Sequence, residues 1–280
     1  NQLGRSNNDL STALERLGSG FKINSAKDDA AGLQIASRLN AQVRGQDAAL
    51  YNSNNAMSMM QTAEGAFDEM TNIAYRMKEL ATQAANGTNG ADEGIALNAE
   101  YVALGDELAS IMQNTSFGGT KLLAVEIASG DEKDGSTAGQ RASTVSVDGK
   151  FQAAVTFQVG SSTAETLSVD VSAALSSIHS SLGTATSDQT ALKSLLDPAV
   201  VNNAGEAMDI VDTLIKNIGT ARSALGASMN RLDHTMNNVT NMKENTQAAA
   251  STLMDADFAA ETSNMTKQQL LMNSGISVLS

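Results

Sequence analysis

The sequence contains no cysteine and no tryptophan, only one proline, and 3% aromatic residues. Without cysteine the chain can form neither a disulfide nor a thiolate-based catalytic or metal site. The single proline, Pro198, leaves room for long uninterrupted helices. The apolar residues are mostly Ala, Leu, Met and Val, whose small side chains suit closely packed helices better than a wide globular core.

Positive charge is also scarce, since 18 Lys and Arg residues stand against 31 Asp and Glu residues and give a formal net charge of −13. The phosphate backbone of a nucleic acid would repel such a chain, so DNA or RNA binding is not expected. No apolar run approaches the roughly 20 residues that a membrane-spanning helix needs. We therefore expect neither a nucleic-acid partner nor membrane insertion.

The longest pattern in the sequence is an apolar repeat between residues 46 and 85, with alternating steps of three and four residues. Its members are Ala56, Met59, Ala63, Ala66, Met70, Ile73, Met77, Leu80 and Ala84. At about 1.5 Å per residue this helix would span roughly 60 Å, and it can bury its stripe only against partner helices. Gly45, just before the repeat, is a candidate kink.

Two further repeats supply the partner helices. The repeat in residues 203–253, with Arg222 in one apolar position, consists of Met208, Val211, Ile215, Ile218, Leu225, Met229, Leu232, Met236 and Val239. The shorter repeat in residues 92–113 consists of Leu97, Tyr101, Leu104, Leu108 and Ile111. These patterns predict a long antiparallel helical rod, built from both chain ends. Its predicted assembly core is Met59, Met70, Ile73, Met77, Val211, Ile218, Leu225 and Leu232.

Shorter helices are expected near both ends of the chain. One covers residues 6–17, a second is opened by a capping box of Ser25 and Asp28, and the last begins at Glu261. Asp28 and Asp29 could also form an acid–base or metal pair. Adjacent residues point to different sides of a helix, so capping is the better interpretation.

The middle of the chain is rich in Ser, Thr, Gly and Val. It predicts strands at 144–147, 151–159 and 166–171, a hairpin turn at 148–149, and short helices at 172–182 and 189–196. The fold class is therefore mainly α with a small β-rich insertion. The expected domains are a terminal helical domain (1–25 and 258–280), a rod (26–122 and 200–257) and the insertion (123–199).

Catalytic chemistry is not indicated. His179 and His234 lie in different segments without ligand-like spacing, and no phosphate loop, nucleophile elbow or zinc spacing occurs. An active site needs convergent groups with tuned protonation, which these residues do not supply. We therefore expect a structural or interaction protein rather than an enzyme, with no cofactor and no bound metal.

Two segments resemble sequence signatures of bacterial flagellins. Residues 15–32 read ERLGSGFKINSAKDDAAG, close to the amino-terminal family signature ERLSSGLRINSAKDDAAG. Near the other end, residues 225–232 resemble LGAxxNRL, and residues 255–266 resemble DADYAxExSNMSR. The matches occur in order at opposite ends and cover roughly residues 6–120 and 203–280.

The resemblance implies a subunit of the extracellular flagellar filament that self-assembles through its terminal helices for motility. Its implied partners are other flagellin subunits and the flagellar export and cap proteins. Family chains start slightly upstream of Asn1 and continue past Ser280, so the resemblance also implies a chain trimmed at both termini. A hook–filament junction protein and a chemoreceptor-like signalling hairpin remain alternatives.

The resemblance further implies binding to the ectodomain of a Toll-like innate immune receptor. Many flagellins are recognised through an arginine and a leucine four residues apart, together with a glutamate on the next helix. The corresponding residues are Arg76, Leu80 and Glu100, and Glu79 and Gln83 complete the candidate receptor-binding set. In the alternative interpretation Leu80 is a core residue, while Arg76 and Glu100 are solvated surface charges.

Overall fold

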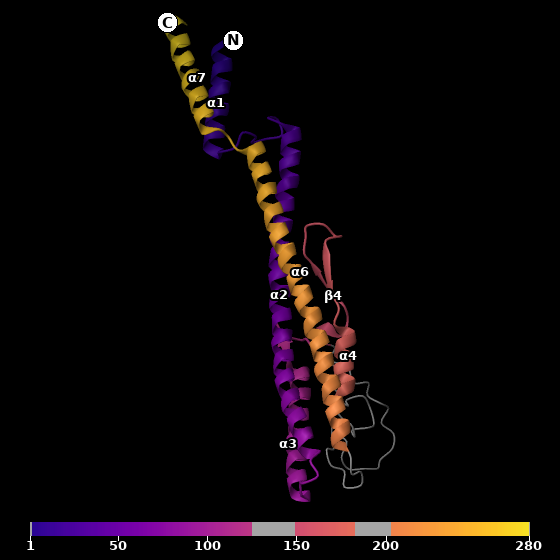
Figure 1. The fold of residues 1–280 in the computed structure, drawn as a ribbon. Coiled ribbons are helices and arrows are strands. Elements are labelled where there is room, and N and C mark those ends of the chain that lie inside the picture. The colour runs from indigo at the N-terminus through magenta and orange to yellow at the C-terminus, as the bar shows by residue number, and fades with distance from the viewer. Residues whose placement is uncertain (1, 125–148, 183–202, 280) are drawn as a thin grey trace, which may run out of the picture. The chain divides into compact units, whose positions relative to one another are not determined.

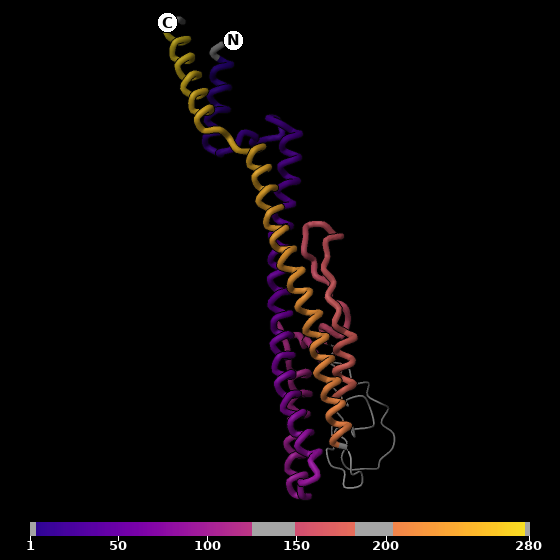
Figure 2. Tube along the Cα trace, in the orientation of Figure 1, coloured from indigo at the N-terminus to yellow at the C-terminus, as the bar shows by residue number. Residues whose placement is uncertain are grey.

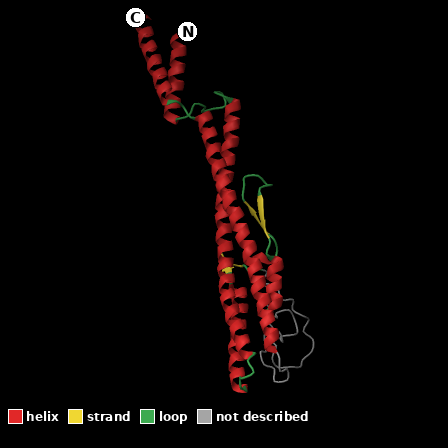
Figure 3. Cartoon of the chain, viewed as in Figure 1, coloured by secondary structure: helices red, strands yellow, loops and turns green. Residues whose placement is uncertain are grey.

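The structure is a computed structural model that describes residues 2–124, 149–182 and 203–279 (Figure 1). The chain divides into two compact units: a first unit of residues 1–51, 159–165 and 236–280, and a second unit of residues 52–158 and 166–235. In the described part, helices predominate and the strands form two short two-stranded sheets (Figure 3). The predicted fold class, mainly α with a small β component, is confirmed, whereas the predicted three-part domain division stays a prediction.

Three helices form the main body of the second unit: parts of α2 (Ala30–Ala84) and α6 (Asn203–Met254), and the whole of α3 (Ala91–Asn114). They lie side by side in Figure 1. Lys78 of α2 forms an ion pair with Asp212, and Arg222 of α6 reaches Glu64 at 3.1 Å. The residue further along α6, Arg222, pairs with the earlier residue of α2, Glu64. The two helices are therefore antiparallel in this unit.

The buried face of α2 is wider than the predicted repeat. Besides the expected positions, a third line of side chains seven residues apart is completely buried: Met60, Phe67, Ala74 and Ala81. Helix α2 has a partner on two sides, since Arg76 bonds to Glu100 of α3 while Glu64 pairs with Arg222 of α6. Two partners require a wider apolar stripe than the two-position seam of a simple coiled coil.

The buried line of α6 differs at alternate positions from the predicted one. In the second unit the buried residues of α6 are Ala204, Ala207, Val211, Leu214, Ile218, Ala221, Leu225, Ser228 and Leu232, and in the first unit they are Ala250 and the predicted Val239. The prediction included Val211, Ile218, Leu225 and Leu232. The buried residues between them lie one residue earlier than predicted, at 207, 214, 221 and 228 instead of 208, 215, 222 and 229. The prediction of Met208, Ile215 and Met229 as central seam residues was therefore wrong, because all three are only half-buried. Small residues at 207, 221 and 228 occupy the inner line and leave the longer side chains at its flank.

A small mixed layer completes the second unit. It contains β1 (Ser116–Phe117) and β2 (Thr120–Lys121), the 3₁₀ turn η1 (Lys150–Gln152), β3 (Val155–Gln158), β4 (Thr166–Val169) and α4 (Ser172–Ser181). Strands β3 and β4 are antiparallel, with Val155 opposite Val169. Two predicted strands are thus confirmed, although residues 150–152 form the turn η1 instead of strand. The predicted strand 144–147, residue 148 of the turn and the helix 189–196 lie outside the described residues.

The first unit pairs the two ends of the chain. Helix α1 (Gln2–Ser19) packs against α7 (Phe258–Leu279), and both chain ends lie at the same end of this pair (Figure 2). Arg16, near the end of α1, forms an ion pair of 3.6 Å with Glu261, near the start of α7. The two helices are therefore antiparallel, and α7 begins three residues before the predicted start at Glu261.

The connectors of this helix pair are tied together by main-chain hydrogen bonds. The backbone N–H of Lys22 donates to Met254 O at 2.6 Å, and that of Ala256 donates to Gly20 O at 2.9 Å. Gly20 has a φ of +79°, in the left-handed region that favours glycine, which ends α1 and turns the chain.

The start of α2 corrects the predicted capping box. Asp29, not Ser25, caps the helix, since its Oδ1 accepts from the Gly32 N–H at 2.9 Å. Asp28 instead accepts from the backbone N–H groups of Ser25 at 2.9 Å and Asn24 at 3.1 Å. These hydrogen bonds lower the pKa of the Asp28 carboxyl. From Ala30 onward α2 continues through Gly45 as helix, and the kink expected at Gly45 stays a prediction.

Candidate interaction surfaces

The first candidate surface lies on the exposed side of α2 and α3 in the second unit. The Arg76 guanidinium donates to Glu100 Oε1 from Nε at 2.9 Å and to Glu79 Oε2 from Nη1 at 2.9 Å. These two carboxylates raise the pKa of Arg76 above its usual value, with Glu100 as the larger influence. Gln83 is exposed one turn beyond Glu79. Four of the five predicted receptor residues are thus exposed on neighbouring elements.

The fifth residue, Leu80, is completely buried. It belongs to the core line of α2, so its side chain cannot contact a partner that docks on the folded surface. The prediction of Leu80 as a direct receptor contact is corrected accordingly: the residue supports the helix beneath Arg76. The apolar group exposed beside Arg76 is instead Tyr75, whose side chain is 55% exposed.

The second candidate surface is apolar and belongs to the first unit. Most of the large apolar side chains that are exposed in the described residues lie there: Leu14, Phe21, Ile35, Tyr51, Phe258, Leu270, Leu271 and Ile276. Few side chains of these two helices are buried. Among the described side chains, Ala13 is the one buried residue of α1, and α7 has no buried residue. The α1–α7 pair thus leaves several large apolar side chains exposed: Leu14, Phe258, Leu270, Leu271 and Ile276.

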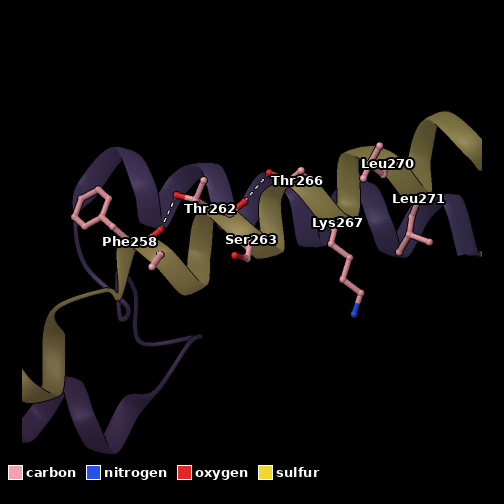
Figure 4. Close-up of a pocket in the computed structure, with 8 residues that line it drawn as sticks. Phe258, Thr262, Ser263, Thr266, Lys267, Leu270 and Leu271 are labelled. Carbon is pink, nitrogen blue, oxygen red and sulfur yellow. Dashed lines mark hydrogen bonds between the residues drawn. The ribbon is translucent and has the colours of Figure 1, made fainter.

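One face of α7 forms an open groove within this surface (Figure 4). Its lining follows steps of one helical turn, with apolar side chains at both ends and hydroxyls between them: Phe258, Ala259, Thr262, Ser263, Thr266, Lys267, Leu270 and Leu271. The Thr262 and Thr266 hydroxyls donate to the carbonyls of Phe258 and Thr262 on their own helix. Because these hydroxyls are engaged within α7, the groove presents mainly apolar area, with Lys267 as its charged group.

The eight residues of the predicted assembly core are all buried inside the chain: Met59, Met70, Ile73, Met77, Val211, Ile218, Leu225 and Leu232. They hold α2 and α6 together and are inaccessible to another subunit. Sequence reasoning did not select Phe258, Leu270, Leu271 and Ile276 as site residues. The available signal was the apolar spacing of a terminal helix that packs against the short polar helix α1.

Within residues 2–124, 149–182 and 203–279, no cluster of His, Asp and Glu could hold a metal ion. His234 is exposed, whereas partial burial lowers the pKa of His179. In the same ranges, no helix is both long enough and apolar enough to span a membrane.

Comparison with protein families gives two matches. The model of the bacterial flagellin N-terminal helical region matches residues 1–127, and that of the C-terminal helical region matches residues 208–280. The chain is 36% identical to flagellin A of Vibrio cholerae over 347 aligned positions, covering 99% of this chain and 92% of that protein. It is 35% identical to flagellin A of Vibrio anguillarum, with the same coverage.

Two solved structures are also similar. The Bacillus cereus flagellin crystal structure is 30% identical and has a TM-score of 0.49, covering 71% of this chain and 94% of that chain. A putative flagellar hook-associated protein from Vibrio parahaemolyticus is 13% identical with a TM-score of 0.56, covering 81% and 99%. At that identity the second likeness concerns the fold alone.

Proposed function

The chain belongs to the bacterial flagellin family, and we propose that the apolar α1–α7 surface is where its subunits join. The protein is a structural subunit of the flagellar filament, and family membership implies assembly with other flagellin subunits. The observation that carries the proposal is the set of exposed apolar side chains on α7 (Phe258, Leu270, Leu271 and Ile276), together with Leu14 on α1.

Burial of this surface provides the driving force for assembly. Apolar area removed from water contributes about 25 cal/mol per Å². Leu270 is 65% exposed and Leu271 is 50% exposed in the single chain, so both have apolar area left to bury. A helix pair that leaves its apolar side chains in water gains stability when a second copy covers them.

The test is Leu271→Lys, expressed in a flagellin-deficient bacterium, with filament number and length measured by electron microscopy. A charge placed in an apolar contact must be desolvated, so few or short filaments are expected. Gln269→Lys is the matched control, because Gln269 is exposed on α7 outside the groove. Wild-type filaments from Leu271→Lys would remove the groove from the proposal.

We further propose that the subunit acts outside the cell, as a structural protein without catalytic activity. The extracellular location is supported by the family, whose members form the external filament. Transfer through the flagellar export channel and insertion beneath the cap follow as proposed steps, which makes the export and cap proteins its further partners. The absence of cysteine is compatible with export of an unfolded chain, since no disulfide would have to be opened.

A second proposal concerns recognition by a Toll-like receptor ectodomain. It is supported by the exposed cluster of Arg76, Glu79, Gln83 and Glu100. The two carboxylates fix the guanidinium in place before a partner binds, which limits the side-chain entropy lost on docking. A central arginine beside an exposed tyrosine is a composition typical of interface residues that carry most of the binding energy.

The test is binding of the purified ectodomain to the wild-type chain and to Arg76→Ala by surface plasmon resonance. We expect the substitution to weaken binding by about 1–2 kcal/mol, as truncation of an interface arginine commonly does. Lys216→Ala is a control, because Lys216 is an exposed basic residue on α6. Equal affinities of wild type and Arg76→Ala, or no binding by either, would end this proposal and leave the filament role untouched.

A further inference from the structure

The turn between α2 and α3 contains both Asn-Gly dipeptides of the chain, Asn86–Gly87 and Asn89–Gly90. Every residue from Ala85 to Gly90 is exposed. Asparagine is a chemically labile residue. A following glycine increases that lability, because it has no Cβ to hinder attack by its backbone nitrogen on the asparagine side chain. Both dipeptides have the required sequence, but their hydrogen bonds differ.

Asn86 is arranged for this attack. Its Oδ1 accepts from the Thr88 N–H at 3.4 Å, which folds the side-chain amide over the Asn86–Gly87 peptide. Neither the Gly87 N–H nor the Asn86 side-chain nitrogen has a hydrogen-bond partner among the described residues. A Cβ added at Gly87 would meet nothing within 4 Å, so water has access to this peptide.

At Asn89, hydrogen bonds hold both the side-chain amide and the Gly90 nitrogen that would have to attack it. Its side-chain nitrogen, the leaving group, donates to Gln83 O at 2.6 Å. The attacking nitrogen would be that of Gly90, whose N–H donates to Glu93 Oε2 at 2.9 Å. Gly90 is also the N-cap of α3, fixed in an extended conformation with φ −79° and ψ 173°. Ring closure at Asn89 would therefore disrupt the start of the helix.

We propose that this turn is a site of slow, water-driven deamidation, and that Asn86 reacts while Asn89 is protected. The Gly87 nitrogen bonds to Cγ of Asn86 and gives up its proton, and the side-chain nitrogen leaves with that proton as ammonia. Water then adds to either carbonyl of the resulting succinimide ring, and the bond from that carbonyl to the nitrogen breaks. The products are aspartate and isoaspartate, with one water consumed, one ammonia released and no redox partner needed.

The modification changes the turn in two ways. The neutral Asn86 side chain becomes a carboxylate, which adds one negative charge to a chain whose formal net charge is −13. The isoaspartate product also lengthens the main chain between α2 and α3 by one methylene group. Old and new subunits would thus differ chemically at this turn without the action of any enzyme.

The experiment is peptide mapping by mass spectrometry during prolonged incubation of the folded chain in mildly alkaline buffer. We expect conversion at Asn86 to exceed conversion at Asn89 severalfold, and the ratio to approach one when the chain is denatured in urea. Gly87→Ala should slow the reaction at Asn86 severalfold, and the open space at Gly87 allows the substitution. Equal conversion at both asparagines in the folded chain would overturn the proposal.

Two substitutions of one residue test the protection of Asn89. Glu93→Ala removes the acceptor of the Gly90 N–H and should raise conversion at Asn89 severalfold, whereas Glu93→Gln retains an acceptor and should leave it low. Circular dichroism establishes that each variant is helical. A rate at Asn89 that is the same in Glu93→Ala as in the wild-type chain would refute the protective role of Glu93.

Discussion

At the scale of single residues, burial decides what a side chain can do. Leu80 and Arg76 lie one turn apart on α2, yet Leu80 is completely buried and Arg76 is exposed in an ion-pair cluster. The sequence could place both residues but could not decide between core and contact for Leu80, since a leucine at heptad spacing suits either role. The cluster around Arg76 was predictable because carboxylates three residues away and on the next helix lie within reach of a guanidinium.

Tyr101 supports a prediction at this scale. It is 1% exposed, and its hydroxyl has no partner among the described residues. A buried polar group without a hydrogen bond costs free energy. Tyr101→Phe should therefore leave the free energy of unfolding equal to or above that of the wild type, as measured by chemical denaturation at neutral pH. A clear loss of stability would mean that the hydroxyl has a partner.

The same residue gives a pH dependence. Burial raises the pKa of the Tyr101 phenol from 10.0 to about 12. Between these values the unfolded chain loses the phenol proton while the folded chain keeps it. The free energy of unfolding is therefore not reduced by this group below pH 10, and it falls as pH rises from 10 toward 12. Tyr101→Phe should lose less stability over this range than the wild type. Parallel curves for the two proteins would contradict the assigned pKa.

At the scale of the element, repeat patterns predicted the helices better than they predicted which residues face inward. The helices were predictable because heptad spacing persists over many turns and proline is absent from them. The inner line of α6 was not, because Ala207 and Ser228 carry a weaker apolar signal than their neighbours Met208 and Met229. At the position between them, Leu214 and Ile215 are similarly apolar, so the pattern could not choose. Small residues allow closer approach of the backbones, and this packing preference is not visible in a pattern that ranks residues by hydrophobicity.

The register of α6 can be tested with one adjacent pair of residues. Leu214→Ala should lower the free energy of unfolding by about 2–5 kcal/mol, because Leu214 is completely buried. Ile215→Ala should cost clearly less, since Ile215 is only half-buried at the flank. Thermal and urea denaturation of both variants provide the comparison. A larger loss for Ile215→Ala would restore the register predicted from the sequence.

At the scale of the whole molecule, an acidic surface opposes the association that apolar side chains favour. The formal net charge is −13, so neighbouring subunits repel one another at neutral pH. The large exposed apolar side chains belong mostly to the first unit. Assembly then depends on a balance between a short-range apolar contact and a longer-range repulsion that salt can screen.

This balance predicts the effect of ionic strength on assembly. The Debye length falls to about 8 Å at physiological salt. Raising sodium chloride from low to physiological concentration should therefore lower the protein concentration at which filaments form. Sedimentation of seeded samples measures this threshold, and sucrose at equal osmolarity serves as the control. A threshold that rises with salt would indicate that attractive ion pairs between subunits outweigh the repulsion.

Two covalent strands, not one, join the α1–α7 pair to α2 and α6. Residues 20–29 and 255–257 run between the helices. The Ala256 N–H donates to Gly20 O and joins the two connectors, and the Lys22 N–H donates to Met254 O at the end of α6. A single strand would act as a swivel, since rotation about its φ and ψ bonds meets little resistance. Two connectors that are hydrogen-bonded to each other oppose twisting, because rotation of the helix pair would have to wrap one connector around the other. Torque applied to the terminal helix pair therefore meets resistance at this joint within the first unit, instead of being dissipated by free rotation.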